Sequence, residues 1–148
     1  SPLLFLLADY SQQIHDMHFM LQKEVVDRMV AEPSTPDYGR LTVMLQYRFV
    51  MDKMLDVPPD AFNPPPKVDS AVVRMIPLPA DQIKVKDPVK LEQVVAQAFS
   101  QRRKTLRNNL RGMLEPQDFE TLGLDSSLRP ENLSVDQFVA IANFLSLN

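Results

Sequence analysis

The chain has 148 residues, of which 45% are hydrophobic and 24% charged, and its net charge is −3. This composition is typical of a globular protein with one medium core or two small ones. The lack of cysteine excludes disulfides, thiol catalysis and zinc ribbons. The three glycines are far apart in the sequence, so it contains no glycine-rich loop of the kind that holds phosphates or dinucleotides.

The sequence contains no apolar run near the roughly 20 residues that span a bilayer. Residues 1–7 are apolar but lack the basic region and the cleavage site of a signal peptide. We therefore expect no membrane partner, a cytoplasmic location, and a first residue that lies in the interior of a longer protein.

Helices and strands alternate in the first half of the predicted structure. Residues 2–13 are expected to form a helix, with proline in its first turn. Residues 17–21 are almost continuously apolar, which predicts a strand buried on both faces. A helix at residues 23–31, a loop at 33–37 and a helix at 41–49 are expected to follow.

Two further strands are predicted at residues 54–57 and 70–76. The alternation of helices and strands indicates an α/β layer over residues 1–79. Two prolines and a polar stretch then predict a linker at residues 80–87.

Residues 88–148 show helical patterns only. Asp87 and Pro88 predict an N-cap followed by proline at the first helical position. A short helix is expected to begin near Pro116 and to stop at Gly123. Ser134 begins a capping box that opens the last helix.

The charge is distributed unevenly along the chain. No acidic residue lies between Glu92 and Glu115, and this interval holds five of the sixteen Lys and Arg residues. If the helix from Pro88 continued through the interval, four of these cations would form a stripe opposite its apolar face. They are Arg103, Lys104, Arg107 and Arg111. Such a stripe suits phosphate contacts, and charge patterning alone leaves a solvated helix face equally open.

Arg102 would project from the same helix toward the apolar face. This position indicates either a partly buried ion pair or a break in the helix.

Residues 57–70 contain three consecutive prolines, which hold an extended and stiff loop. Phe62 could stack on an unstacked base from this loop, with Lys67 near a phosphate. Residue types alone favour the alternative that Phe62 fills the core and the prolines end a strand, because buried aromatics are the common case.

Other catalytic and metal-binding signals are weak. His15 and His18 have no third ligand at metal-binding spacing, so we expect no metal. The carboxylates are scattered, and no pair of nucleophile and base can be assembled.

Four blocks of sequence, at residues 18–26, 38–43, 57–74 and 99–110, occur in an order that points to one family. The most specific is Val-Pro-Pro-Asp-Ala-Phe-Asn-Pro-Pro-Pro-Lys-Val-Asp-Ser at 57–70, and Arg-Arg-Lys-Thr-Leu-Arg-Asn at 102–108 supports it. The chain resembles the ribosomal RNA adenine dimethyltransferases, especially the bacterial small-subunit type whose loss gives kasugamycin resistance.

The resemblance implies methyl transfer from S-adenosylmethionine to the exocyclic amines of two adjacent adenosines in small-subunit ribosomal RNA. Members of the family begin with a Rossmann-like half that holds this cofactor, followed by an Asn-(Leu/Ile)-Pro-Tyr-type motif. Both would precede Ser1, so we expect no cofactor-binding residues and no complete catalytic set in this chain, which alone would be inactive.

The fold that the resemblance implies is α/β plus all-α. It comprises the last strands and helices of a truncated Rossmann-like methyltransferase sheet, followed by a small helical RNA-binding domain. The strand at residues 70–76 is expected to lie antiparallel between the other two strands.

The resemblance assigns Phe62 to the target-base pocket, where it would stack on the flipped adenine. The neighbouring residues Asn63, Pro64, Pro65 and Pro66 would shape the loop. Further cations would face the RNA of the small ribosomal subunit. These are Lys23, Arg40 and Lys67, together with Arg103, Lys104, Arg107 and Arg111 of the helical domain.

Two other functions stay open from the sequence. The chain could be a non-catalytic RNA- or ribosome-binding module that works as it stands. It could also be a basic helical domain that binds DNA or protein.

Overall fold

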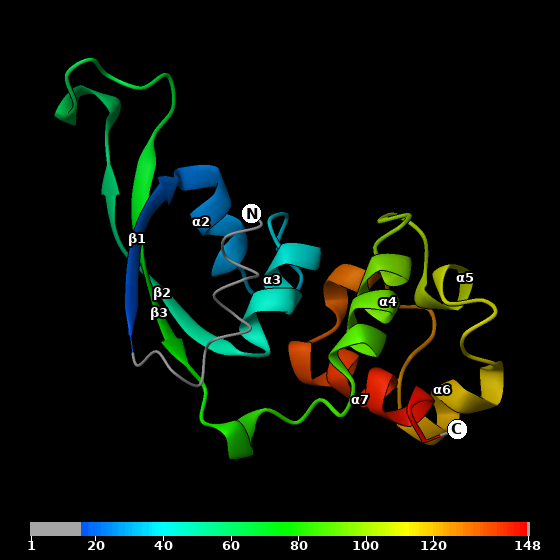
Figure 1. The fold of residues 1–148 in the computed structure, drawn as a ribbon. Helices are drawn as coiled ribbons and strands as arrows, with labels where there is room; N and C mark the ends of the chain where they lie inside the picture. The colour runs from blue at the N-terminus through cyan, green and yellow to red at the C-terminus, as the bar shows by residue number, and fades with distance from the viewer. Residues whose placement is uncertain (1–15, 148) are drawn as a thin grey trace.

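The computed structural model describes residues 16–147 (Figure 1). A three-stranded sheet lies at one side of the molecule, helices α2 (Lys23–Met29) and α3 (Arg40–Gln46) pack beside it, and the remaining helices form the other side. The helix predicted at residues 2–13 lies outside the described residues.

The sheet consists of β1 (Met17–Gln22), β2 (Phe49–Val57) and β3 (Ser70–Pro77). Its strand order is β1-β3-β2, and both neighbouring pairs are antiparallel. The prediction that the last strand lies antiparallel between the other two is therefore confirmed. β2 begins earlier than predicted and contains an irregularity in its register between Lys53 and Leu55.

Burial in β1 differs from the prediction. Met17 is buried and Phe19 is half-buried, whereas His18, Met20 and Gln22 are exposed. The expectation of a strand buried on both faces is wrong for the described part of the chain. The physical reason is that α2 and α3 cover one face of the sheet, and alternate residues of a strand point to opposite faces.

The third predicted helix, at residues 41–49, is shorter in the structure. α3 ends at Gln46, and Phe49 already belongs to β2, where it is almost completely buried. Phe49 joins Val26, Met29 and Leu45 in the core between the sheet and the helices. Phe49 was misassigned because its spacing from Leu41 also fits the buried face of a helix.

The helical part contains α4 (Pro88–Ala98), α5 (Leu106–Asn109), α6 (Pro116–Leu122) and α7 (Val135–Leu145). Several local predictions are confirmed. The Asp87 carboxylate accepts a hydrogen bond from the Val89 N–H at 3.0 Å, and Gly123 ends α6 with a φ of 68°. Ser134 and Gln137 form the capping box of α7. No helix within residues 16–147 has the length and apolar character needed to cross a bilayer.

One core extends across the predicted linker. Tyr38 and Tyr47, from the first half of the chain, are buried with Leu91, Phe138 and Ile141 of the helical part. Tyr38 also donates a hydrogen bond from its hydroxyl to the Leu133 carbonyl at 2.5 Å. The division into residues 1–79, 80–87 and 88–148 stays a prediction, but the two parts are in direct contact.

The predicted linker itself packs on the helical part. Ile83 and Val85 contact its core. The side-chain amide of Asn143 donates to the Lys84 carbonyl at 2.9 Å and accepts from the Lys86 N–H at 2.8 Å. α7 therefore holds residues 84–86 in place.

Candidate nucleic-acid interface

The basic segment, residues 102–111, does not continue the preceding helix. α4 ends at Ala98, and only Leu106–Asn109 form the short helix α5. The N–H groups of Leu106 and Arg107 donate to the carbonyls of Leu128 and Ser126, at 2.7 and 3.0 Å. The helix from Pro88 therefore does not continue through the interval, which was the condition for a single basic stripe, because these N–H groups bond to a distant loop instead of the preceding turn.

Asn109 holds this turn from the inside. Its side chain is only 7% exposed, and its Nδ2 donates to the carbonyls of Ala98 and Gln101, each at 2.8 Å. The Gln97 side chain donates in turn to the Asn109 carbonyl at 3.0 Å. Sequence reasoning missed this role, although an amide at helical spacing from the buried Leu106 was a usable signal.

The four predicted RNA-binding cations of this segment are exposed. They are Arg103, Lys104, Arg107 and Arg111. None of their side chains forms an ion pair or a hydrogen bond with any residue in the described range 16–147. Their positive charge is therefore not neutralised by a described neighbour, which suits contact with an external anion.

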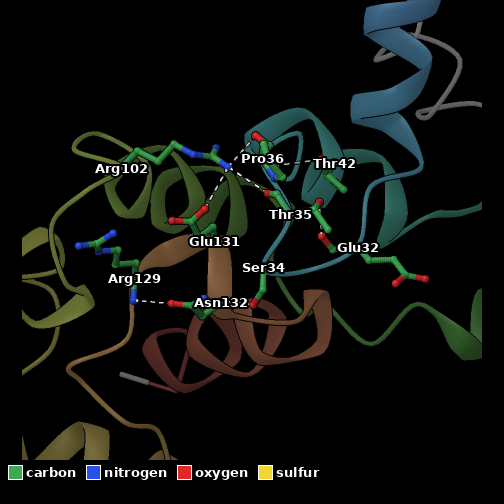
Figure 2. Close-up of polar contacts among 10 residues, drawn as sticks. Glu32, Ser34, Thr35, Pro36, Thr42, Arg102, Arg129, Glu131 and Asn132 are labelled. Carbon is green, nitrogen blue, oxygen red and sulfur yellow. Dashed lines mark hydrogen bonds and ion pairs between the residues drawn. The ribbon is translucent and has the colours of Figure 1, made fainter.

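Arg102 behaves differently from the cations that follow it. Its Nη2 lies 3.5 Å from the Glu131 carboxylate and donates to the Pro36 carbonyl at 3.0 Å (Figure 2). Its side chain is partly buried, at 38% exposure. The sequence left open an ion pair or a helix break at this residue, and the structure contains both.

The proline loop, residues 58–69, lies at the end of the hairpin formed by β2 and β3 (Figure 1). A 3-10 turn at Pro59–Ala61 precedes Phe62, and the Asn63–Pro64 peptide bond is cis. Phe62 is half-buried and belongs to neither cluster of buried residues. It therefore does not fill either core, contrary to the alternative that residue types favoured.

Most other predicted residues of this loop are exposed, including Asn63, Pro64, Pro65 and Lys67. The Lys67 side chain has no ion pair with the described residues. The tip of the hairpin and α5 lie at opposite sides of the molecule in Figure 1. The structure thus does not bring Phe62 together with the basic segment.

Two other predicted RNA-binding cations are engaged within the protein. Lys23 donates from Nζ to the Asp27 carboxylate at 2.6 Å, and this hydrogen bond raises the pKa of the Lys23 amine. Arg40 pairs with Glu92 at 3.2 Å, and both side chains are more than half exposed. An RNA phosphate would have to compete with these carboxylates.

An open pocket lies where α2 begins, beside the proline loop. It is lined by Gln22, Lys23, Glu24, Asp27, Asp37, Val68 and Asp69. Four carboxylates against one ammonium make this pocket unfavourable for an anion. Within residues 16–147, no group of three or more histidines and carboxylates is arranged to hold a metal ion.

Comparison with known proteins identifies the chain. A family model described as "Ribosomal RNA adenine dimethylase" matches residues 1–147. This chain belongs to the ribosomal RNA adenine dimethylase family.

Relatives within the dimethylase family are close in sequence. The "Ribosomal RNA small subunit methyltransferase A" of Chromobacterium violaceum is 66% identical over 145 residues, and that of Laribacter hongkongensis is 62% identical over 148 residues. These matches cover 98% and 97% of this chain but only 55% of each relative. The chain thus spans about half the length of the curated relatives it matches.

Solved structures support the partial methyltransferase fold of this dimethylase chain. A dimethyladenosine transferase from Plasmodium falciparum superposes with a TM-score of 0.81 at 26% identity, covering 95% of this chain and 61% of that chain. The 23S rRNA methyltransferase ErmE gives a TM-score of 0.64 at 22% identity, with 95% and 59% covered, which shows the fold alone. The sheet is therefore part of a Rossmann-like methyltransferase fold, as the sequence predicted.

The dimethylase family implies S-adenosylmethionine as the methyl donor, but the described residues do not fit this cofactor. Gly39 begins α3, whereas Gly112 and Gly123 follow short helical turns, so the glycines form no common loop. The pocket beside α2 is lined by polar and charged side chains, and Val68 is the one apolar residue of its lining that could contact an adenine ring. No catalytic step is therefore assigned to the described residues.

Proposed function

We propose that this chain is the RNA-contacting part of an enzyme that transfers methyl groups from S-adenosylmethionine to adjacent adenosines of small-subunit ribosomal RNA. The cofactor would bind to residues outside the described range, and the chain alone would be inactive. The ribosomal substrate is consistent with a cytoplasmic location.

The basic segment is the observation that carries this proposal. Arg103, Lys104, Arg107 and Arg111 are exposed and lack acidic partners among the described residues. The turn that carries them is held by Asn109, so these side chains project from a fixed backbone. Exposed cations on a fixed scaffold are suited to the phosphates of a folded RNA.

The double variant Arg103→Ala with Arg107→Ala in the full-length protein tests the interface. We expect about 10-fold weaker binding to purified small-subunit ribosomal RNA, because two phosphate contacts are lost. The slope of log affinity against log salt should also fall by about 1.4 to 1.8. Filter binding at several salt concentrations measures both quantities.

A matched control is the double variant Lys84→Ala with Lys90→Ala, which removes the same charge outside the basic segment. It should leave the affinity and the slope nearly unchanged. Equal losses in both double variants would mean that only the net charge matters. Unchanged binding in the Arg103 and Arg107 variant would overturn the proposed interface.

We propose in addition that Phe62 stacks on the target adenine, in a loop shaped by Asn63, Pro64 and Pro65. Its half-buried position outside both cores leaves part of the ring accessible to a ligand. Lys67, exposed in the same loop, would contact a nearby phosphate. Lys23 and Arg40 would contribute less, because each is already paired with a carboxylate.

Phe62→Ala in the full-length enzyme should lower the rate of methylation by about 5- to 100-fold, which is the expected range for one lost base stack. Phe62→Tyr keeps the ring and should retain most of the activity. Incorporation of labelled methyl groups into ribosomal RNA and the melting temperature are measured together. A large fall in melting temperature with little loss of activity would contradict the stacking role.

A further inference from the structure

Three segments that are distant in sequence meet at Arg102 (Figure 2). They are the loop at residues 34–36, the turn that carries Arg102, and the turn at residues 131–132. We call their polar contacts the Arg102 clasp. The loop belongs to the first half of the chain and the other two segments belong to the helical part, so the clasp joins the two.

The guanidinium group occupies the centre of the clasp. Arg102 Nη2 donates to the carbonyls of Pro36 at 3.0 Å and Thr35 at 3.4 Å, and it lies 3.5 Å from the Glu131 carboxylate. The carbon at the centre of the guanidinium group is 5.9 Å from the centre of the Phe99 ring, which adds a cation–π contact.

The segments that contact the guanidinium group are bonded to each other and leave space for it. The Ser34 N–H donates to the Glu131 carbonyl at 2.7 Å, and the Asn132 side chain donates to the Ser34 hydroxyl at 3.1 Å. A Cβ atom at Gly39 would lie 3.3 Å from Arg102 Nη1, which is tighter than most contacts of a real Cβ. Gly39 has an extended φ of −165°, so the lack of a side chain serves space and not backbone conformation.

Arg102 and Asn109 hold the same turn from two sides. Asn109 donates to the carbonyls of Ala98 and Gln101 from the core. Arg102 directly follows Gln101, and its side chain donates to the carbonyls of Thr35 and Pro36 in the neighbouring loop. Arg103 and Lys104 follow directly and are exposed, so the backbone that carries these two cations is fixed at both sides before any ligand binds.

We propose that Arg102 is a positioning residue for RNA recognition, which acts through Arg103 and Lys104 and makes no phosphate contact of its own. Both hydrogens of Nη2 already face three oxygen acceptors, which leaves the Nε and Nη1 hydrogens for an external anion. The nearby Glu131 carboxylate offsets the charge of the guanidinium group, so a phosphate is attracted less strongly to Arg102 than to Arg103 and Lys104. A fixed turn lowers the ordering cost of binding for the two exposed cations. This inference rests on the proposed RNA-binding function.

The first test is Arg102→Ala in the full-length protein, with purified small-subunit ribosomal RNA as the probe. We expect about 5-fold weaker binding, because the turn that carries the two exposed cations must now be ordered during association. The salt slope should stay unchanged, because the number of phosphate contacts in the complex is the same. A direct phosphate contact would instead reduce the slope by about 0.7 to 0.9.

A double-mutant cycle adds a readout that a purely structural role would not move. Once Arg103 and Lys104 are both replaced by Ala, Arg102→Ala should cause no further loss of RNA affinity. Additive losses would overturn the positioning role. No loss from the Arg103 and Lys104 replacements themselves would overturn the proposed RNA interface, and this inference with it.

Gly39→Ala is the matched variant, because its added methyl group would lie 3.3 Å from Arg102 Nη1 and would press on the guanidinium group. It leaves every charge of the protein in place. We expect it to weaken RNA binding by about 2-fold, in the same direction as Arg102→Ala. If Arg102 contacted RNA directly, its displacement from the clasp would leave the affinity unchanged or increase it. This variant also keeps the test decisive if Arg102→Ala proves too unstable to purify.

Discussion

The lysines beside Asp27 and the exposed cations of the basic segment have opposite surroundings. In the sheet region, the Asp27 carboxylate accepts from Lys23 at 2.6 Å and from Lys53 at 3.2 Å, which ties α2 to β2. In the basic segment, Arg103 and Lys104 have no acidic partner among the described residues. Basic side chains therefore form ion pairs within the protein where carboxylates lie nearby, and they extend into solvent where carboxylates are missing.

The difference extends to how each region is held. A charged pair that is partly exposed to solvent, Asp27 with Lys53, joins α2 to β2. The basic segment is held by the neutral, buried amide of Asn109 and by the Arg102 clasp, and neither uses the exposed side chains of Arg103 and Lys104. A neutral internal contact stabilises the turn and leaves the external charge of the segment unchanged. Three experiments test this contrast.

The largest effect is expected from Asn109→Ala. The substitution leaves the buried carbonyl of Ala98 and the partly buried carbonyl of Gln101 without their donor, which should lower the free energy of unfolding by about 2–3 kcal/mol. Urea unfolding of the full-length protein measures this change. Asn108→Ala removes one long hydrogen bond at an exposed neighbour, from Asn108 Nδ2 to Asn109 Oδ1 at 3.4 Å, and leaves both bonds donated by Asn109 in place, so it should cost about 0.5 kcal/mol. Equal losses in the two variants would show that the turn does not depend on the buried amide.

Asp27→Ala should leave Lys23 without its carboxylate partner, as Arg103 and Lys104 are in the basic segment. It removes the partner of Lys23 and Lys53, and we expect unfolding to become easier by about 0.5–1 kcal/mol. Lys53 keeps its second partner, Asp56, at 3.2 Å, so the ammonium group that is freed is that of Lys23. It should raise the affinity for ribosomal RNA by about 2-fold, with a steeper salt dependence. Asp52→Ala, at an exposed carboxylate of β2, controls for the change in net charge. If it raised the affinity equally, the pairing would not explain the contrast.

The smallest effect concerns pH. The hydrogen bond from Lys23 holds the pKa of the Asp27 carboxyl below its ordinary value. The contribution of the ionised Asp27 carboxylate to the free energy of unfolding is therefore complete above about pH 5, and it is lost as the pH falls below about 4. The difference in unfolding free energy between the wild type and Asp27→Asn should shrink over that range. A difference independent of pH would mean that the ion pair does not stabilise the fold.

Local signals predicted much of the fold. Asp87 with Pro88, Gly123, and the pair of Ser134 and Gln137 marked helix ends correctly, because caps depend on residues within one turn. The order of the strands came from the family resemblance and not from periodicity. Phe49 was assigned to a helix because its spacing fits either a helix or the start of a strand.

The sequence predicted which residues belong to the candidate site, but it did not predict how they are arranged in space. The uninterrupted group of cations from Arg102 to Arg111 was visible in the sequence, and so were Phe62 and its prolines. Nothing local indicated that Arg102 would face Glu131 while Arg103 stays exposed. That separation depends on the loop at residues 35–36, which is more than 60 residues away in sequence.

By itself, the sequence determined the family, the helix caps, the strand predicted at residues 70–76 and the group of cations from Arg102 to Arg111. Those properties follow from residue types at short spacing, or from blocks specific to the family. Only the tertiary structure decided where the basic segment breaks and which cations are paired. It did so because the hydrogen bonds of Asn109, Leu106 and Arg102 join segments that have no relation along the chain.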